Sequence, residues 1–79
     1  TRNAADRAAR ERYARLSERE REVLSLIVAG LTNKEIGRAL ALSPRTVENH
    51  RAHVFDKLQA ESLAQVVRLY AELVERAAE

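Results

Sequence analysis

The chain has 79 residues, with 14 Lys and Arg against 12 Asp and Glu, and a formal net charge of +2 at pH 7. This length allows one domain at most, and such a small domain buries only about 60% of its unfolded surface. Because the chain has no Cys, a disulfide framework and a thiolate zinc site are excluded. No apolar run approaches the roughly 20 residues of a membrane span, and none has the pattern of a signal peptide.

Residues 1–15 carry most of the positive charge. Five Arg stand there against Asp6 and Glu11, whereas residues 16–79 carry nine Lys and Arg against ten Asp and Glu. The basic balance weakly favours a nucleic-acid partner, but any such surface in residues 16–79 must be local. With Tyr13 as its only large hydrophobic residue, the first segment is expected to be a partly helical interdomain linker. Since the chain starts at Thr1 and has no Met, we also expect a piece of a longer protein.

Four helices are predicted after this segment, over about 18–29, 33–40, 44–58 and 63–77, and the predicted fold class is all-α. Each helix start carries a capping pattern. Three are capping boxes, in which side chain and backbone satisfy each other: Ser17-x-x-Glu20, Thr32-x-x-Glu35 and Ser62-x-x-Gln65. The fourth is Ser43-Pro44, an N-cap followed by Pro at the first helical position. Gly30 stands where a left-handed C-terminal cap is needed.

The helix predicted over 44–58 has an apolar face and a polar face. At 100° per residue, Val47, Val54 and Leu58 face the core. Arg51 and Phe55 fall on one flank, and His50 and Lys57 on the other. The residues expected to point away from the core are Arg45, Asn49, Ala52, His53 and Asp56.

Residues 33–52 have the spacing of a helix-turn-helix, in which two capped helices are joined by a turn of about three residues at Ala41-Leu42. The small side chain of Ala52 would let the second helix sit deep in a DNA major groove. The starts of both helices, near Thr32 and Ser43, offer N–H groups and a positive dipole end to phosphates. The alternative is that these residues are only caps and that Arg45 is a solvated charge. The combination of features favours DNA binding.

The helix predicted over 63–77 has an apolar stripe of roughly 160°, wider than the ~100° needed to face a core. The surplus predicts a docking face for a partner helix, although a small domain could instead wrap this helix more deeply. The stripe comprises Leu63, Val66, Val67, Leu69, Tyr70, Leu73 and Val74.

No enzyme pattern is present: the sequence lacks a Gly-rich phosphate loop and a nucleophile-and-base constellation, and it calls for no cofactor. His50 and His53 could both reach one metal ion, but no third ligand follows at a suitable spacing. They are better placed as hydrogen-bond donors to DNA. A protein-interaction module that uses only the last helix is an alternative of another class.

Residues 16–69 resemble the LuxR-type helix-turn-helix domain. The matching motifs occur in order: "LSEREREVL", "GLTNKEI", "LSPRTVENH" and "KLQAESLAQ". The segment "SPRTVENHRAHVFDKLQAESLAQVVRL" looks most like the output domains of FixJ/NarL two-component response regulators. The resemblance implies a four-helix domain over 16–79 with the helix-turn-helix at about 33–52, in a bacterial cytoplasmic transcription regulator.

The resemblance also implies partners and site residues. The partners are promoter DNA in its major groove, a second copy through the last helix, an absent N-terminal receiver domain and RNA polymerase, with no membrane. Base-reading positions fall on Glu48, Asn49 and Ala52. The other expected DNA contacts are Thr32, Asn33, Lys34, Ser43, Arg45, Thr46, His50, His53 and Lys57. The expected dimer interface is Val66, Leu69, Tyr70 and Leu73.

Three positions depart from the usual family pattern. Glu48 stands where many relatives carry a basic residue, and it could accept a hydrogen bond from a cytosine amino group. Gln59 stands where Gly often ends the recognition helix. Gly37 inside a helix costs about 1 kcal/mol against Ala, which close helix approach would explain. Region 4 of a sigma factor and the quorum-sensing LuxR regulators are the nearest alternatives.

Overall fold

A computed structural model describes residues 2–78, and the side chains of residues 4–77, as an assembly of helices measuring 39 × 26 × 21 Å. No strand occurs within residues 2–78, so the predicted all-α class is confirmed. The helices are α1 (Arg2–Ala14), α2 (Glu18–Val28), α3 (Asn33–Leu40), α4 (Pro44–Leu58) and α5 (Leu63–Ala78).

The predicted caps set the helix starts. Ser17 and Glu20 form a complete capping box before α2, and Thr32 and Glu35 form another before α3. The Ser43 side chain caps α4, with Pro44 at its first position. The pattern before α5 differs slightly from the prediction: Ser62 Oγ accepts from the Gln65 N–H, but the Gln65 side chain accepts from Glu61 rather than from Ser62.

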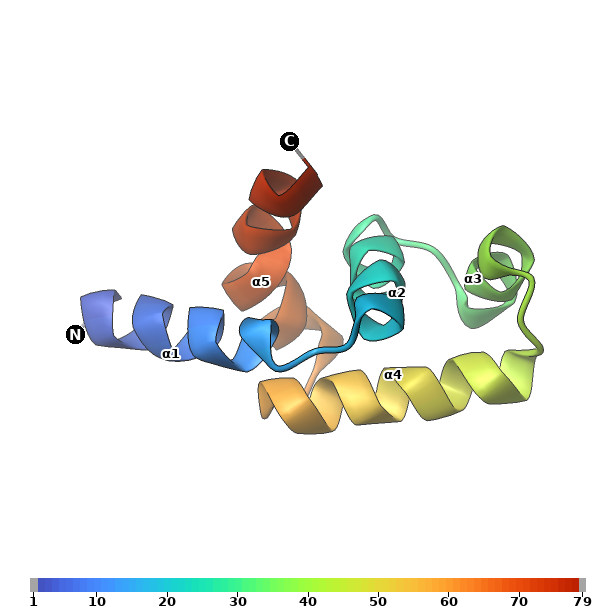
Figure 1. Ribbon diagram of the computed structural model, residues 1–79, viewed down its shortest axis with the longest axis horizontal. Coiled ribbons are helices and arrows are strands. Elements are labelled where there is room, and N and C mark those ends of the chain that lie inside the picture. The colour runs from blue at the N-terminus through green and yellow to red at the C-terminus, as the bar shows by residue number, and fades with distance from the viewer. Residues whose placement is uncertain (1, 79) are drawn as a thin grey trace.

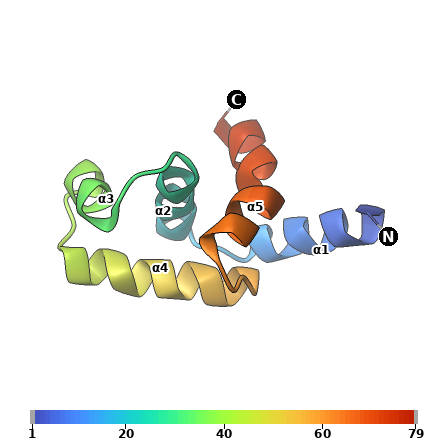
Figure 2. The same ribbon diagram turned by 180° about the vertical axis from the view of Figure 1, so that it is seen from behind.

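Helix α4 runs along one long side of the molecule, and α2 and α3 lie across it (Figures 1 and 2). Helix α5 packs beside α2 near the C-terminal end of α4, while α3 lies near its N-terminal end. The inner face of α4 contacts α1, α2 and α3, and within residues 2–78 no helix packs on its outer face.

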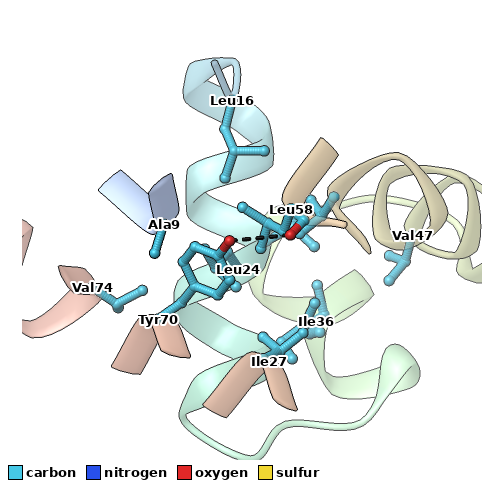
Figure 3. Packing of buried hydrophobic residues seen from close by; sticks show 12 residues of the cluster. Ala9, Leu16, Leu24, Ile27, Ile36, Val47, Leu58, Tyr70 and Val74 are labelled. Atoms are coloured by element: carbon cyan, nitrogen blue, oxygen red, sulfur yellow. Dashed lines mark hydrogen bonds between the residues drawn. The ribbon is translucent and has the colours of Figure 1, made fainter. Parts of the chain in front are cut away.

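The core forms where α2, α3, α4 and α5 meet (Figure 3). Leu24, Ile36, Leu58 and Tyr70 are among its largest side chains and have no exposed surface. The Tyr70 hydroxyl donates a hydrogen bond of 3.1 Å to the main-chain carbonyl of Leu58, the last residue of α4. A buried phenol needs such a partner, and here it also satisfies a carbonyl at a helix end, which has no partner within its own helix.

Helix α1 is one continuous helix packed onto α4 and α5, rather than a partly helical segment without a packing face. Ala9 is 4% exposed, and Tyr13 packs against the core cluster. The sequence did not reveal this packing face, because its buried residue is a small Ala among many Arg and produces no apolar stripe. Packing of α1 also covers part of Leu69 and Leu73, which explains part of the wide apolar stripe on α5.

Two of the residues expected in a dimer interface are buried within the domain itself. Val66 and Tyr70 have 0% exposed surface, and Leu69 and Leu73 are partly buried, so a dimer interface at these four residues stays a prediction. The physical reason for the burial is the second alternative considered for the stripe: the small domain surrounds this helix more deeply than a one-sided packing requires. Among the described side chains of α5, the large hydrophobic ones that are exposed are Leu63 and Val67.

The turn between α3 and α4 folds closely over Gly37. Ala41 adopts a left-handed conformation with φ 56°, and the Leu42 N–H donates to the Gly37 carbonyl at 2.8 Å. A Cβ at Gly37 would lie 2.7 Å from the Leu42 carbonyl oxygen and 3.6 Å from a methyl of Val47. The close approach expected at this glycine is therefore made mainly by the turn and only secondarily by α4.

Candidate nucleic-acid interface

The outer face of α4 is a continuous exposed strip, as predicted. All five residues expected to point away from the core are exposed, and Glu48 joins them: Arg45, Glu48, Asn49, Ala52, His53 and Asp56. Thr46 and His50 are partly buried on its edges. A helix with one such face free is what entry into a major groove requires.

The start of α4 is held by its own hydroxyl groups. Ser43 Oγ accepts from the Thr46 N–H at 3.2 Å and lies 2.9 Å from Thr46 Oγ1. Because these hydroxyls already bond to each other, their first contribution is to fix the helix start. Pro44 has no N–H, so Arg45 supplies the first free charge and main-chain donor at this end.

The start of α3 is partly occupied by an acidic group. Glu35 Oε1 accepts from the Thr32 N–H at 2.9 Å, and Thr32 Oγ1 accepts from the Glu35 N–H at 3.2 Å. Hydrogen bonds from the Thr32 backbone and side chain hold the pKa of Glu35 below its ordinary value, so this carboxylate stays charged. The first-turn N–H groups left for an anion are those of Asn33 and Lys34.

Arg51 links the start of α3 to the flank of α4, a role that the sequence reasoning missed. Its guanidinium donates to Asn33 Oδ1 at 3.4 Å and lies 5.4 Å from the centre of the Phe55 ring. The i, i+4 spacing of Arg51 and Phe55 could have suggested their contact. The bond to Asn33, 18 residues away, could not be read from any local pattern.

These three residues, with Glu48 and Ala52, line an open hollow of about 320 Å³, the α3–α4 hollow. It places the first residue of α3 beside the exposed strip of α4. The predicted contacts at Asn33, Glu48 and Ala52 are therefore brought together on one surface.

Lys57 lies on the opposite flank and has a protein partner. Its ammonium donates to Glu20 Oε1 at 2.7 Å, and the same oxygen accepts from the Ser17 N–H at 2.8 Å. Glu20 is only 5% exposed. Burial acts to raise the pKa of Glu20, but the bonds from Lys57 and Ser17 outweigh it and hold the pKa below its ordinary value. Lys57 thus ties α4 to α2, and its phosphate contact stays a prediction.

Other chemistries find no support in the described part of the chain. No group of three or more His, Cys, Asp or Glu side chains is placed to hold a metal ion among the described residues. No helix within residues 2–78 combines the length and the apolar character needed to cross a membrane.

Comparisons with known proteins agree with this geometry. Residues 14–70 match the family described as bacterial regulatory proteins, luxR family. The chain is 58% identical over 60 residues to the transcriptional regulatory protein FixJ of Rhizobium meliloti, covering 76% of this chain and 29% of that protein. It is 44% identical over 61 residues to the tetrathionate response regulatory protein TtrR of Salmonella typhimurium, covering 77% and 30%.

A solved structure of full-length FixJ from B. japonicum resembles this one with a TM-score of 0.77 and 47% identity, covering 86% of this chain and 34% of that chain. The chain thus spans about a third of the length of such relatives. The family match, the fold and the free face of α4 lead to one conclusion: the chain belongs to the luxR family of bacterial regulatory proteins and is a helix-turn-helix DNA-binding domain, not an enzyme.

Proposed function

We propose that this domain binds particular DNA sequences by placing α4 in the major groove, as the output domain of a two-component response regulator. One observation supports this proposal most directly. The bond from Arg51 to Asn33 joins the start of α3 to the exposed strip of α4, so that both elements form one surface. Phosphate contacts position such a helix, and base-edge contacts specify the sequence. The relatives named FixJ and TtrR support the response-regulator context.

Lys34 is proposed as a phosphate contact because it is exposed beside the free N–H groups at the start of α3. Replacing one phosphate-bound cation lowers the salt dependence of DNA binding by about one unit in slope. We expect Lys34→Ala to weaken binding to every duplex and to flatten this slope, measured by fluorescence anisotropy at several salt concentrations. Arg10→Ala in α1 is the matched control, since it removes one exposed cation far from α3. Equal slopes for the two variants would exclude Lys34 as a phosphate contact.

Asn49 is proposed as a base reader because its side chain is exposed near the middle of the free face of α4. Loss of a good base contact costs about 1–3 kcal/mol of discrimination. Asn49→Ala should therefore reduce the ratio of specific to random-sequence affinity. A variant that lost affinity equally on both duplexes would make Asn49 a positioning contact.

We further propose that two copies meet through the flank of α5 that carries Leu63 and Val67, which are 47% and 40% exposed. These are the large hydrophobic side chains left uncovered after α1 and α2 have packed on α5. Val67→Glu should leave the fold intact and yield one copy per duplex where the wild type gives two, measured by sedimentation. Ala14→Glu, an exposed change on α1, is the control. A Val67→Glu protein that still bound as a pair would exclude this flank.

The alternative of a protein-interaction module makes a different prediction from the same exposed flank. It requires self-association without DNA and no protection of any duplex. Sequence-dependent binding in the anisotropy experiment would exclude it.

A further inference from the structure

The α3–α4 hollow differs in chemistry from the rest of the exposed strip. Asn33, Glu48, Arg51, Ala52 and Phe55 line its open volume of about 320 Å³, and most of the surface that lines it is apolar. Elsewhere the outer face of α4 presents charged and amide groups. An apolar recess on a surface that meets DNA can recognise only an apolar part of DNA.

The charges of the lining help to decide which part of DNA fits. Glu48 and Arg51 both line the hollow, and no ion pair involving the Glu48 carboxylate occurs among residues 4–77. Because the two side chains bring one negative and one positive charge, the lining gives a phosphate no net attraction. The apolar group that a major groove offers is the C5 methyl of thymine, and Ala and Phe side chains are suited to contact it.

The walls of the hollow are already held in place. Arg51 lies over one side of the Phe55 ring at 5.4 Å and is bonded to Asn33, so the ring is supported from the α3 side. A preformed site loses less conformational freedom on binding than one that must be assembled.

We propose that the α3–α4 hollow receives the C5 methyl group of a thymine, which makes Ala52 and Phe55 specificity-determining residues. This rests on the proposed sequence-specific binding. Burial of one methyl-sized group is worth about fourfold in affinity. Removal of that methyl from the DNA, with nothing else changed, should therefore cost a factor of about three to five at one position in each half-site.

The test begins by enriching bound duplexes from a random library with the 79-residue chain. Each thymine of the preferred duplex is then replaced in turn by deoxyuridine, which lacks only the methyl group, and the affinities are compared. We expect the loss at one thymine position per half-site and no change at the others.

Protein variants then connect that position to the hollow. Ala52→Leu fills the recess, so its affinities for the thymine and uracil duplexes should become equal. Ala39→Leu makes the same change at an exposed position of α3 outside the hollow, and it should keep the threefold to fivefold ratio. Because each ratio is measured within one protein, a partial loss of folding does not imitate the result.

The outcomes separate the two proposals. A library in which no sequence is enriched would contradict the proposed function, and the role of the hollow with it. An enriched duplex that tolerates uracil at every position, or an unchanged ratio in Ala52→Leu, would overturn the thymine contact alone.

Discussion

Gly37→Ala tests the turn of the helix-turn-helix, because two effects of opposite sign meet at this residue. At an ordinary helix position, Ala is more favourable than Gly by about 1 kcal/mol. Here the new Cβ would lie 2.7 Å from the carbonyl oxygen of Leu42, a main-chain atom that cannot rotate away. The turn also cannot move away easily, because the Leu42 N–H donates a hydrogen bond of 2.8 Å to the Gly37 carbonyl.

Overpacking of a tight site costs about 1–3 kcal/mol, and a contact with main chain lies in the upper part of that range. After the gain in helix propensity is subtracted, we expect Gly37→Ala to lower the free energy of unfolding by about 1–2 kcal/mol. For a domain of this size, each kcal/mol shifts the Tm by about 4–8 °C.

The assay is thermal unfolding followed by circular dichroism, with Ala39→Gly as the control in the same helix. Ala39 is exposed, so its variant should lose only the helix-propensity term of about 1 kcal/mol. A Gly37→Ala protein with a Tm above that of the wild type would refute the reasoning, since the turn would then have room for the methyl group.

Three further predictions concern the ends of helix α4 and its ties to its neighbours. Gln59 ends α4 in a left-handed conformation with φ 54°, so Gln59→Gly should raise stability by about 1 kcal/mol in thermal unfolding, and a lower Tm would contradict this. Tyr70→Phe should lower the free energy of unfolding by about 1 kcal/mol, because the Leu58 carbonyl loses its buried donor. Calorimetry can measure this loss, and an unchanged Tm would mean that the bond makes no net contribution to stability. The pKa of Glu20 in the folded state is lowered. Its bond to Lys57 therefore stabilises the fold at pH values above the ordinary pKa of 4.5, and this stabilisation is lost as the pH falls through the folded-state pKa. Urea unfolding should therefore find Glu20→Gln less stable than the wild type at neutral pH, with the difference shrinking in acid; a constant difference would exclude the charge as its cause.

Helix starts were predictable from the sequence because capping is local. Ser17, Thr32 and Ser43 each act on a residue three positions away, so the pattern alone fixes the start of α2, α3 and α4. The α1 packing was not predictable, because Ala9 becomes a buried contact only when α4 and α5 supply the other side. The same limit applies to Tyr70, whose position on an apolar stripe does not say which neighbour covers it.

The exposed strip of α4 was predictable for a similar reason, since helical periodicity separates Asn49 and Ala52 from Val47 and Val54. The contacts that give this surface its shape were not. Arg51 and Asn33, which join the strip to α3, are 18 residues apart, and Lys57 and Glu20, which tie α4 to α2, are 37 residues apart. Long-range partners of this kind depend on the angles between helices, which propensity and capping do not determine.

The bond between the Tyr70 hydroxyl and the last carbonyl of α4 joins two helices to which we assign separate tasks in the proposed function. In a pair formed through α5, the helix that meets the second copy is fastened to the end of the helix that lies in the groove. The α4 helices of the two copies would then be held at a fixed separation, so the pair would require one particular spacing between half-sites. A base pair inserted between half-sites displaces and rotates one half-site relative to the other, and the DNA rather than the protein would have to deform to restore both contacts.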